Sequence, residues 1–281
     1  MPDSYAVIGN PVAHSKSPRI HAAFAVQTSQ DIVYKTIFCE PTAFAATVGA
    51  FRESGGRGMN VTLPFKHEAS KLANWRSVRA QSAGAANTLT FDAQGMTADN
   101  TDGVGLVRDI TENLRVTLRG KRILLLGAGG ASYGVVGPLL EEAPGALVVV
   151  NRTVSKADAL AKHFTPITAR CALSSCSYDA LKKTGASFDV VINATSAGLT
   201  GDMPDLRDDL FNDGALAYDM VYGKVTSFMA FAKEHGAPGV TVADGLGMLV
   251  EQAAESFYIW RRVRPQTAPV MEMMRREATT S

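Results

Sequence analysis

Residues 121–153, which read KRILLLGAGGASYGVVGPLLEEAPGALVVVNRT, decide the fold of this 281-residue chain. The segment Arg122 to Leu126 consists almost wholly of bulky apolar side chains, as expected of a strand buried on both faces of a parallel sheet. Glycines follow at once, a helix begins near Ala131, and a second apolar run, Ala146 to Val150, completes the unit. This order of strand, turn, helix and strand is typical of the nucleotide-binding half of a doubly wound sheet.

The turn after the first strand predicts a phosphate-binding site. Gly127, Gly129 and Gly130 allow the backbone to turn sharply and to approach a pyrophosphate, toward which the following helix directs its free N–H groups. Ser132 stands where the third glycine of G-x-G-x-x-G would lie, and we interpret this as a variant of the turn. We therefore expect a dinucleotide at the turn, and a redox enzyme is the leading hypothesis.

The residues after the second strand indicate which nicotinamide cofactor binds. An acidic residue about 20 residues beyond the glycines would accept hydrogen bonds from an unphosphorylated ribose. Here Asn151, Arg152 and Thr153 occupy that place, and Lys156 follows in the next helix. A guanidinium and a hydroxyl suit a 2′-phosphate, which a carboxylate would repel. The sequence favours NADP over NAD, although an arginine in this place could also be an ordinary solvated residue.

Composition limits the class of protein. Lys and Arg number 28 against 27 Asp and Glu, so nothing in the charge balance indicates a nucleic acid or an acidic membrane as partner. No apolar stretch is long enough to cross a bilayer, and no secretory signal is visible. Cys39, Cys171 and Cys176 lack C-x-x-C spacing and the five histidines are scattered, so we expect neither a disulfide nor a metal site. We expect a soluble, cytoplasmic protein that acts on a small molecule.

The remaining pattern alternates strands with helices, which predicts an α/β fold in two domains. We expect a substrate-binding and catalytic domain of residues 1–102 with 246–281, and a doubly wound, NADP-binding Rossmann domain of residues 103–245. Further strands are predicted at Tyr5 to Ile8, Val33 to Phe38, Met59 to Thr62, Thr88 to Phe91, Met96 to Ala98, Val190 to Asn193, Ala215 to Asp219 and Val240 to Val242. Helices are predicted from Ser17, Pro41 and Phe65, and over Gly103 to Asn113, Ser155 to His163, Thr226 to Glu234, Gly247 to Arg262 and Pro269 to Arg276. The last two helices are expected to return to the first domain.

A lysine is the first candidate for the acid–base group that a nicotinamide enzyme needs besides its hydride carrier. The histidines do not cluster at ligand spacing, which leaves lysine as the stronger candidate. Lys66 follows the strand that ends near Thr62, beyond Pro64 and Phe65. It therefore leaves the carboxyl edge of the sheet, where ligands bind in open α/β folds.

Nine sequence blocks, all in order, make the chain resemble the bacterial shikimate dehydrogenases over essentially its whole length. They read GNPVAHSKSPRIHAAF, NVTLPFKHE, GAANTL, NTDGVG, GAGGAS, NRT, NATSAG, YDMVYG and DGLGMLVEQAAESF. The resemblance implies reduction of 3-dehydroshikimate to shikimate with NADPH, a step in the synthesis of aromatic amino acid precursors.

The resemblance also implies roles for individual residues. Lys66 and Asp102 would form the catalytic pair beside the reacting hydroxyl, and the sequence leaves open which of them transfers the proton. Ser15 and Ser17 would hold the carboxylate. The implied substrate contacts are Ser15, Ser17, Asn60, Thr62, Lys66, Asn87, Asp102, Tyr222 and Gln252. The predicted cofactor contacts are Gly127, Ala128, Gly129, Gly130, Ala131, Asn151, Arg152, Thr153, Lys156, Asn193, Thr195, Met220, Gly245 and Met248.

Purely structural roles remain open for two of these residues. Ser17 precedes Pro18 and could be the N-cap of a helix, and Asp102 could cap a helix that begins at Gly103.

Other functions remain as alternatives. A quinate/shikimate dehydrogenase of relaxed specificity is one, although Ser17 and the NRTVSKA stretch favour shikimate with NADP. A non-catalytic NADP-binding sensor would keep the glycine turn without needing Lys66 and Asp102. Another two-domain dehydrogenase, acting on a folate or a tRNA-linked substrate, could share the architecture because fold does not fix function. A monomer and a homodimer are both compatible with the sequence.

Overall fold

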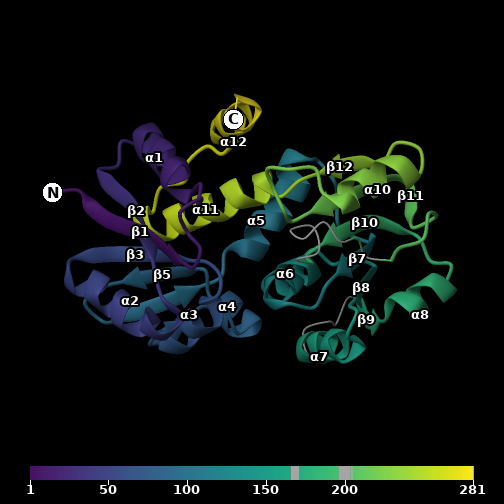
Figure 1. Cartoon of the computed structure of the whole chain (residues 1–281), viewed down its shortest axis with the longest axis horizontal. Coiled ribbons are helices and arrows are strands. Elements are labelled where there is room, and N and C mark those ends of the chain that lie inside the picture. Colours follow the sequence, from purple (N-terminus) through teal and green to yellow (C-terminus); the bar gives the residue numbers. More distant parts are fainter. Residues whose placement is uncertain (166–170, 196–202, 204, 281) are drawn as a thin grey trace. The chain divides into compact units, whose positions relative to one another are not determined.

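The computed structural model describes residues 1–165, 171–195, 203 and 205–280. The chain forms two compact units, unit 1 (Met1–Gly105 with Leu249–Ser281) and unit 2 (Leu106–Met248). Each unit contains its own six-stranded sheet flanked by helices (Figure 1). The predicted α/β class with two domains is confirmed, and the C-terminal helices return to the first unit as expected.

The sheet of unit 1 is mixed. Its strands are β1 (Asp3–Gly9), β2 (Ile32–Phe38), β3 (Gly56–Val61), β4 (Trp75–Arg76), β5 (Thr88–Phe91) and β6 (Met96–Asp99). They are arranged in the order β2-β1-β3-β5-β6-β4. β1 runs parallel to β2 and β3, whereas β5 runs antiparallel to both β3 and β6.

The two faces of this sheet differ in character because side chains alternate along each strand. Ala6 and Ile8 of β1 face the same buried cluster as Met59 and Val61 of β3. Tyr5 and Val7 occupy the alternate positions of β1, and Val7 is in register with Asn60 of β3. This second face therefore carries polar groups into the interior of unit 1.

The helices of unit 1 cover both faces. They are α1 (Ser17–Thr28), the 3₁₀ turn η1 (Pro41–Ala43), α2 (Phe44–Glu53), α3 (Lys66–Leu72), α4 (Val78–Ala83), α11 (Leu246–Arg261) and α12 (Ala268–Thr280). Phe44 and Phe51 of α2 pack into the apolar cluster of the first face. On the second face, Trp260 of α11 stacks on Tyr5 with ring centroids 4.7 Å apart. α11 thereby brings its polar side chains to the polar face of the sheet.

Unit 2 is a parallel, doubly wound fold. Its strands are β7 (Arg122–Leu126), β8 (Ala146–Val150), β9 (Ala172–Cys176), β10 (Phe188–Asn193), β11 (Phe211–Asp219) and β12 (Thr241–Ala243). Its helices are α6 (Gly130–Glu141), α7 (Val154–Phe164), α8 (Tyr178–Lys183) and α10 (Ser227–His235), and α5 (Asp102–Arg108) leads into it. The strand order β9-β8-β7-β10-β11-β12 is the classic order of a Rossmann fold. The connections reverse between β7 and β10, which marks the place where such folds bind dinucleotides.

The structure differs from the predicted pattern in several details, and the short elements β4, α4 and α8 are additional to it. β9 was not predicted, because its residues ALSSC form a partly exposed edge strand without an apolar run. The single helix predicted over Gly103 to Asn113 is instead α5 followed by one π-helical segment, Asp109–Asn113. The helix predicted from Pro41 begins as η1 and becomes α-helical only at Phe44.

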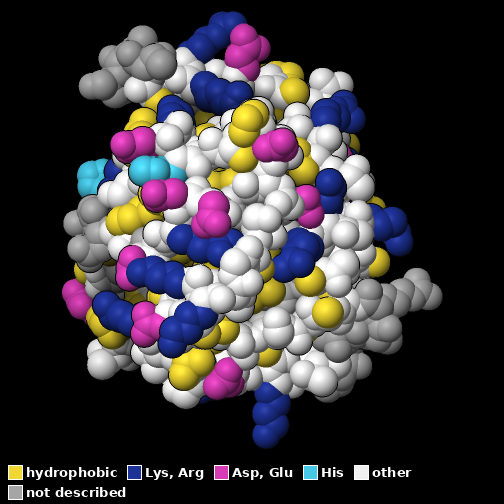
Figure 2. Space-filling model, turned by 90° about the vertical axis from the view of Figure 1, so that its right-hand side faces the viewer, with side chains coloured by type: hydrophobic (Ala, Val, Ile, Leu, Met, Phe, Trp, Pro, Cys, Tyr) yellow, Lys and Arg dark blue, Asp and Glu magenta, His cyan; other side chains and the backbone are white. Residues whose placement is uncertain are grey.

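The surface mixes charges of both signs. Figure 2 shows lysine and arginine side chains interspersed with aspartate and glutamate on the face that it displays. Within the described ranges, no helix is both long and apolar enough to cross a membrane, and no group of histidine, cysteine and acidic side chains is placed to hold a metal ion.

Candidate active site

Lys66 and Asp102 form an ion pair in unit 1. Lys66 is the first residue of α3, just beyond the end of β3, and its Nζ donates to Asp102 Oδ2 over 2.6 Å. The two side chains are 26% and 11% exposed, so the pair is largely shielded yet still accessible. Asp102 is itself the first residue of α5, and its other oxygen, Oδ1, accepts from Asn87. Its carboxylate therefore bonds to both of these side chains, and the helix begins at Asp102 itself, one residue earlier than expected.

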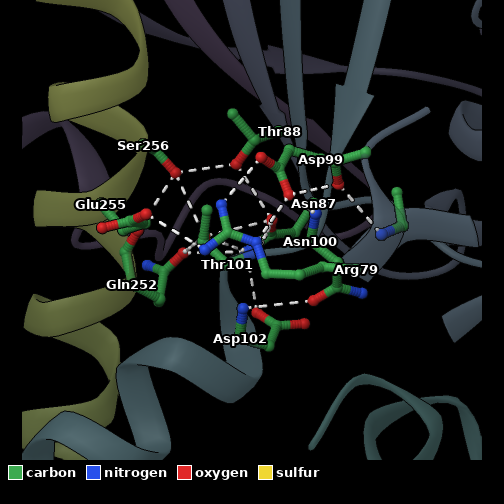
Figure 3. Close-up of polar contacts among 12 residues, drawn as sticks. Arg79, Asn87, Thr88, Asp99, Asn100, Thr101, Asp102, Gln252, Glu255 and Ser256 are labelled. Atoms are coloured by element: carbon green, nitrogen blue, oxygen red, sulfur yellow. Dashed lines mark hydrogen bonds and ion pairs between the residues drawn. The ribbon is translucent and has the colours of Figure 1, made fainter. Parts of the chain in front are cut away.

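Asn87 connects Asp102 of this pair with Gln252 of α11 (Figure 3). The amide nitrogen of Asn87 donates to Asp102 Oδ1 at 2.8 Å, to Thr101 Oγ1 at 2.9 Å and to Gln252 Oε1 at 3.1 Å. Its amide oxygen accepts from the backbone N–H of Thr101 at 2.9 Å and from the hydroxyl of Thr88 at 2.9 Å. This dense bonding fixes the orientation of the Asn87 amide, and with it the position of the Asp102 carboxylate.

Asn60 occupies the polar face of the sheet near the end of β3. Its Nδ2 donates to Asn87 O, Thr88 Oγ1 and Ser256 Oγ at 3.0 to 3.3 Å, and its Oδ1 accepts from the Tyr34 hydroxyl at 2.7 Å. Asn60 is only 6% exposed. Its two amide protons are thus shared among three protein acceptors, and a spare lone pair of Oδ1 is what it can offer a ligand.

Ser15, Ser17 and Thr62 lie at the start of α1 and the end of β3. α1 begins at Ser17, Lys16 is its N-cap residue, and no side chain forms a capping hydrogen bond there. The alternative that Ser17 is an N-cap is therefore wrong. Instead, the backbone N–H of Ser17 donates to Ser15 Oγ at 3.3 Å. Gly9 makes room for Thr62, since a Cβ at Gly9 would lie 2.3 Å from Thr62 Cγ2.

Sequence reasoning missed three buried hydroxyl residues of this site, Thr88, Thr101 and Ser256. All three are 0% exposed. The Thr88 and Ser256 hydroxyls lie 2.7 Å apart, and those of Thr101 and Ser256 lie 3.2 Å apart. Thr88 and Thr101 stand next to predicted site residues in the blocks GAANTL and NTDGVG, and Ser256 lies one helical turn after Gln252. Those adjacencies were the available signals.

Arg79 holds the helix that carries Gln252 and Ser256 against the sheet. Its guanidinium contacts Asp99 of β6 at 2.8 Å and Glu255 of α11 at 3.1 Å (Figure 3). Arg79 has a fixed position because it is partly buried and bonded to two carboxylates. Its ion pair with Glu255 therefore also fixes the orientation of α11 relative to β6.

The glycine turn of unit 2 has the geometry that a pyrophosphate needs. Gly127 has φ +104°, and a Cβ there would lie 3.1 Å from Thr195 Cγ2 and 3.2 Å from the backbone of Ala194. Ala128 is buried, whereas Gly129, Gly130 and Ala131 at the start of α6 are exposed. The Ser132 hydroxyl donates to Gly127 O at 2.8 Å. Ser132 therefore fastens the turn in the place where the standard pattern has its third glycine.

The segment after β8 presents cations next to this turn. Asn151 Oδ1 accepts from the N–H of Ala128 at 3.2 Å, and Asn151 Nδ2 donates to Thr153 O at 2.9 Å. Asn151 thus ties the segment to the glycine turn. Arg152, Thr153 and Lys156 are exposed, and neither cation forms an ion pair with any residue that the structure describes. Free donors at this position fit a 2′-phosphate.

Four further predicted cofactor residues, Asn193, Thr195, Met220 and Gly245, lie at or just after the ends of β10, β11 and β12. Asn193 is fully buried, donates to Asp219 Oδ2 at 3.0 Å, and accepts from the backbone N–H and the hydroxyl of Thr195. Its amide therefore shapes the strand end from inside, while Thr195 is partly exposed. Gly245 packs tightly on the backbone of Met220, because a Cβ there would lie 2.3 Å from Met220 O.

Two further predicted site residues of unit 2, Met248 and Tyr222, are described by their burial. Met248 is 8% exposed and packs against the apolar core of unit 2. Tyr222 follows β11, is 36% exposed, and has its pKa raised by partial burial of the phenol.

Comparisons with known proteins point to one family. Residues 7–89 match the shikimate dehydrogenase substrate binding domain, residues 107–200 match shikimate / quinate 5-dehydrogenase, and residues 245–275 match the shikimate 5′-dehydrogenase C-terminal domain. A shikimate dehydrogenase (NADP(+)) of Methylobacillus flagellatus is 57% identical over 273 residues, which cover 97% of this chain and 99% of that protein.

Solved structures agree in fold along nearly the whole chain. An Ael1 enzyme from Pseudomonas putida is 48% identical with a TM-score of 0.89, over 96% of this chain and 97% of that one. A shikimate 5-dehydrogenase from Thermus thermophilus, in complex with NADP(H) and shikimate, is 31% identical with a TM-score of 0.84, over 98% and 99% of the two chains. Because both sequence and fold match over nearly the full length of these proteins, the chain belongs to the shikimate dehydrogenase family.

Proposed function

We propose that this chain catalyses the reversible, NADPH-dependent reduction of 3-dehydroshikimate to shikimate. The observation that carries the proposal is the ion pair of Lys66 and Asp102, set in a buried frame of amide and hydroxyl groups in unit 1. A non-catalytic NADP sensor would need the glycine turn of unit 2 but not this frame. Family membership gives the reaction, and the paired side chains supply the means of moving its proton.

Unit 1 serves as the substrate-binding and catalytic domain, and unit 2 as the NADP-binding domain. The hydroxyls of Ser15 and Ser17 hold the substrate carboxylate. Polar groups of Asn60, Thr62, Asn87, Tyr222 and Gln252 bind the ring hydroxyls and the ring. Neutral donors and acceptors of this kind discriminate among polyhydroxy acids, because a wrong ligand leaves a buried polar group unpaired at about 1–3 kcal/mol each.

The Lys66 ammonium acts on the oxygen of the reacting carbonyl. NADPH supplies the hydride, which goes to the carbonyl carbon of 3-dehydroshikimate. Negative charge then develops on the oxygen, where the Lys66 ammonium stabilises it and donates a proton. Asp102 keeps the ammonium in place through its 2.6 Å contact, and solvent returns a proton to the pair. Oxidation of shikimate follows the same path in reverse.

The residues of unit 2 fit NADP. A Cβ at Gly129, at the N-terminus of α6, would have no atom of the described residues within 4 Å, which leaves space for a pyrophosphate beside this backbone. Arg152, Thr153 and Lys156 hold the 2′-phosphate. Asn193 and Thr195 shape the edge of the dinucleotide site, and Met220, Gly245 and Met248 form the stretch near the nicotinamide.

The test is an initial-rate assay of the purified chain at the reduced-nicotinamide band. Shikimate and quinate are each combined with NADP and NAD. Fast turnover of shikimate with NADP, slow turnover of quinate and weak use of NAD are expected. Comparable rates with quinate would instead support a quinate/shikimate dehydrogenase of relaxed specificity. NADP binding without turnover of either acid would support the sensor.

Lys71→Ala is the matched control for Lys66→Ala in this assay. Both lysines lie on α3, but Lys71 is exposed and lies in its last turn. Only the Lys66 variant should lose activity. A cytoplasmic location and a monomeric or homodimeric state stay predictions, which fractionation and light scattering would check.

A further inference from the structure

We propose that Tyr34 is a positioning residue of the substrate site, acting through Asn60. The inference rests on the proposed function, because Asn60 matters here as a residue that binds the substrate. Neither the glycine turn nor the sequence blocks pointed to Tyr34, which lies on β2 at the edge of the sheet.

The register of the sheet brings the two side chains together. Tyr34 pairs with Tyr5 of β1, and Asn60 pairs with Val7 of β1. Tyr5 and Val7 are two residues apart, so both point to the same face, and their partners do as well. The phenol of Tyr34 thus extends from β2 across β1 toward β3, where its hydroxyl reaches Asn60 Oδ1 at 2.7 Å.

The donor and the acceptor of the Tyr34–Asn60 hydrogen bond follow from the other hydrogen bonds of the Asn60 amide. Asn60 Nδ2 donates to Asn87 O, Thr88 Oγ1 and Ser256 Oγ, and of these the carbonyl oxygen of Asn87 can only accept. Nδ2 must therefore face them, and Oδ1 must face Tyr34, which can only donate to it. The carbonyl of Asn87 thus selects the orientation of the Asn60 amide, and the Tyr34 hydroxyl holds the Asn60 acceptor at a fixed place.

Tyr34 also lies near a serine of the predicted substrate site. Burial raises the pKa of its phenol well above its usual value, and the neighbouring Ser17 hydroxyl opposes that shift. The Tyr34 phenol is thus near a serine assigned to the carboxylate as well as bonded to the amide assigned to the ring hydroxyls. Asn60 in turn bonds to the carbonyl of Asn87, whose amide holds Asp102.

The ring of Tyr34 is held independently of its hydroxyl. It stacks on the imidazole of His21 of α1, with centroids 4.3 Å apart and planes 6° apart. His21 is fully buried, and burial lowers its pKa to about 3, so this ring is neutral at physiological pH. Because the stack does not involve the phenol oxygen, a Tyr34→Phe substitution keeps the packing and removes only the hydroxyl.

The experiment compares Tyr34→Phe with Tyr5→Phe. Tyr5 is the register partner of Tyr34 on the same sheet, but its hydroxyl accepts from Arg261 and does not touch Asn60. For Tyr34→Phe we expect the KM for shikimate to rise by about 5-fold to 30-fold, the change that loss of one buried hydrogen bond of 1–2 kcal/mol produces. The KM for NADP should change less than about twofold, because Asn60 is proposed to bind the substrate and not the cofactor. Tyr5→Phe should leave both constants near those of the wild type.

A double-mutant cycle with Asn60→Ala tests whether Tyr34 acts through Asn60, and Asn60→Ser replaces it if the alanine variant does not fold. In the Asn60→Ala or Asn60→Ser background, Tyr34→Phe should have little further effect on kcat/KM, because the amide that the Tyr34 hydroxyl positions is already absent. An equal effect in both backgrounds, or an unchanged KM in the single variant, would overturn the inference while leaving the proposed reaction intact. If the wild type did not oxidise shikimate at all, the proposed function itself would fail.

Discussion

The Lys66 ammonium and the Asp102 carboxylate meet at 2.6 Å, although 36 residues separate them in the sequence. The contact depends on two elements that end or begin at the same edge of the sheet of unit 1, the turn after β3 and the start of α5. Asn87 holds the other carboxylate oxygen at 2.8 Å. Asp102 therefore has little rotational freedom, and its charge orients Lys66 toward one place.

Removal of either member of this pair should abolish most of the activity. Lys66→Ala and Asp102→Asn are each expected to lower kcat by about 100-fold to 10,000-fold, the range of a positioned acid–base group. The double variant should be little worse than the poorer single variant, because the two residues act as a unit. Steady-state kinetics with shikimate and NADP measures this, and unchanged NADP binding by the variants serves as the folding control. Independent, multiplicative losses would show that the two groups do not work together.

Arg152 should determine the preference for NADP. Arg152→Ala removes a charge-assisted contact of about 1.5–3 kcal/mol, so the KM for NADP should rise by about 10-fold to 150-fold. The KM for NAD, which lacks the 2′-phosphate, should hardly change. Lys162→Ala is the matched control, since Lys162 is an exposed cation in the last turn of α7. Equal effects on the two cofactors would contradict a specific role at the 2′-phosphate.

The sequence predicts the Rossmann unit well because its signals are local. The apolar strand before Gly127, the glycines and the second strand all lie within residues 121–153, and each is visible in a short window. β9 was not predicted for the opposite reason, since an edge strand in which no side chain is fully buried needs no apolar run.

The candidate site was predicted only as far as its residues resemble those of a known family. The contact of Asn60 with Ser256 joins residues 196 positions apart, and that of Tyr34 with Asn60 joins two strands that are not neighbours in the sheet. No periodicity or motif spacing reports such pairs. The role of Ser132 was likewise not predictable. The sequence shows only that a serine replaces the third glycine of the pattern, whereas the structure shows that its hydroxyl donates to Gly127 O.

His21 should make the protein less stable in mild acid. Its pKa is about 3 in the folded protein, against an ordinary value of 6.5, because burial disfavours the charged ring. Between these values the unfolded chain binds a proton that the folded protein does not, so stability is lost as the pH falls below about 6.5. From pH 7.5 to pH 5.5 this one residue should lower the free energy of unfolding by about 1.4 kcal/mol.

The variant His21→Phe isolates that contribution. Any packing cost of the phenyl ring is the same at both pH values, so the comparison rests on the difference between them. Urea denaturation at pH 7.5 and pH 5.5 should show a smaller loss in the variant than in the wild type, by about 1.4 kcal/mol. Parallel losses in the two proteins would mean that the folded state accommodates the imidazolium.

Gly247→Ala should destabilise unit 2 although alanine is the better helix former. Gly247 lies in the first turn of α11, and a Cβ there would meet Asp109 Oδ1 at 1.9 Å. The carboxylate has little room to move, because Tyr218 donates to Asp109 Oδ2 at 2.6 Å and Asn113 donates to Oδ1 at 3.0 Å. We expect a loss of about 1–3 kcal/mol in the free energy of unfolding, as for other overpacked sites. Gly49→Ala in α2 is the control, since a Cβ added there would have nothing within 4 Å. This substitution should raise the free energy of unfolding by about 0.5–1 kcal/mol. If urea denaturation showed that both substitutions change the free energy of unfolding in the same direction, the close approach of Asp109 to Gly247 would not control the stability of this helix.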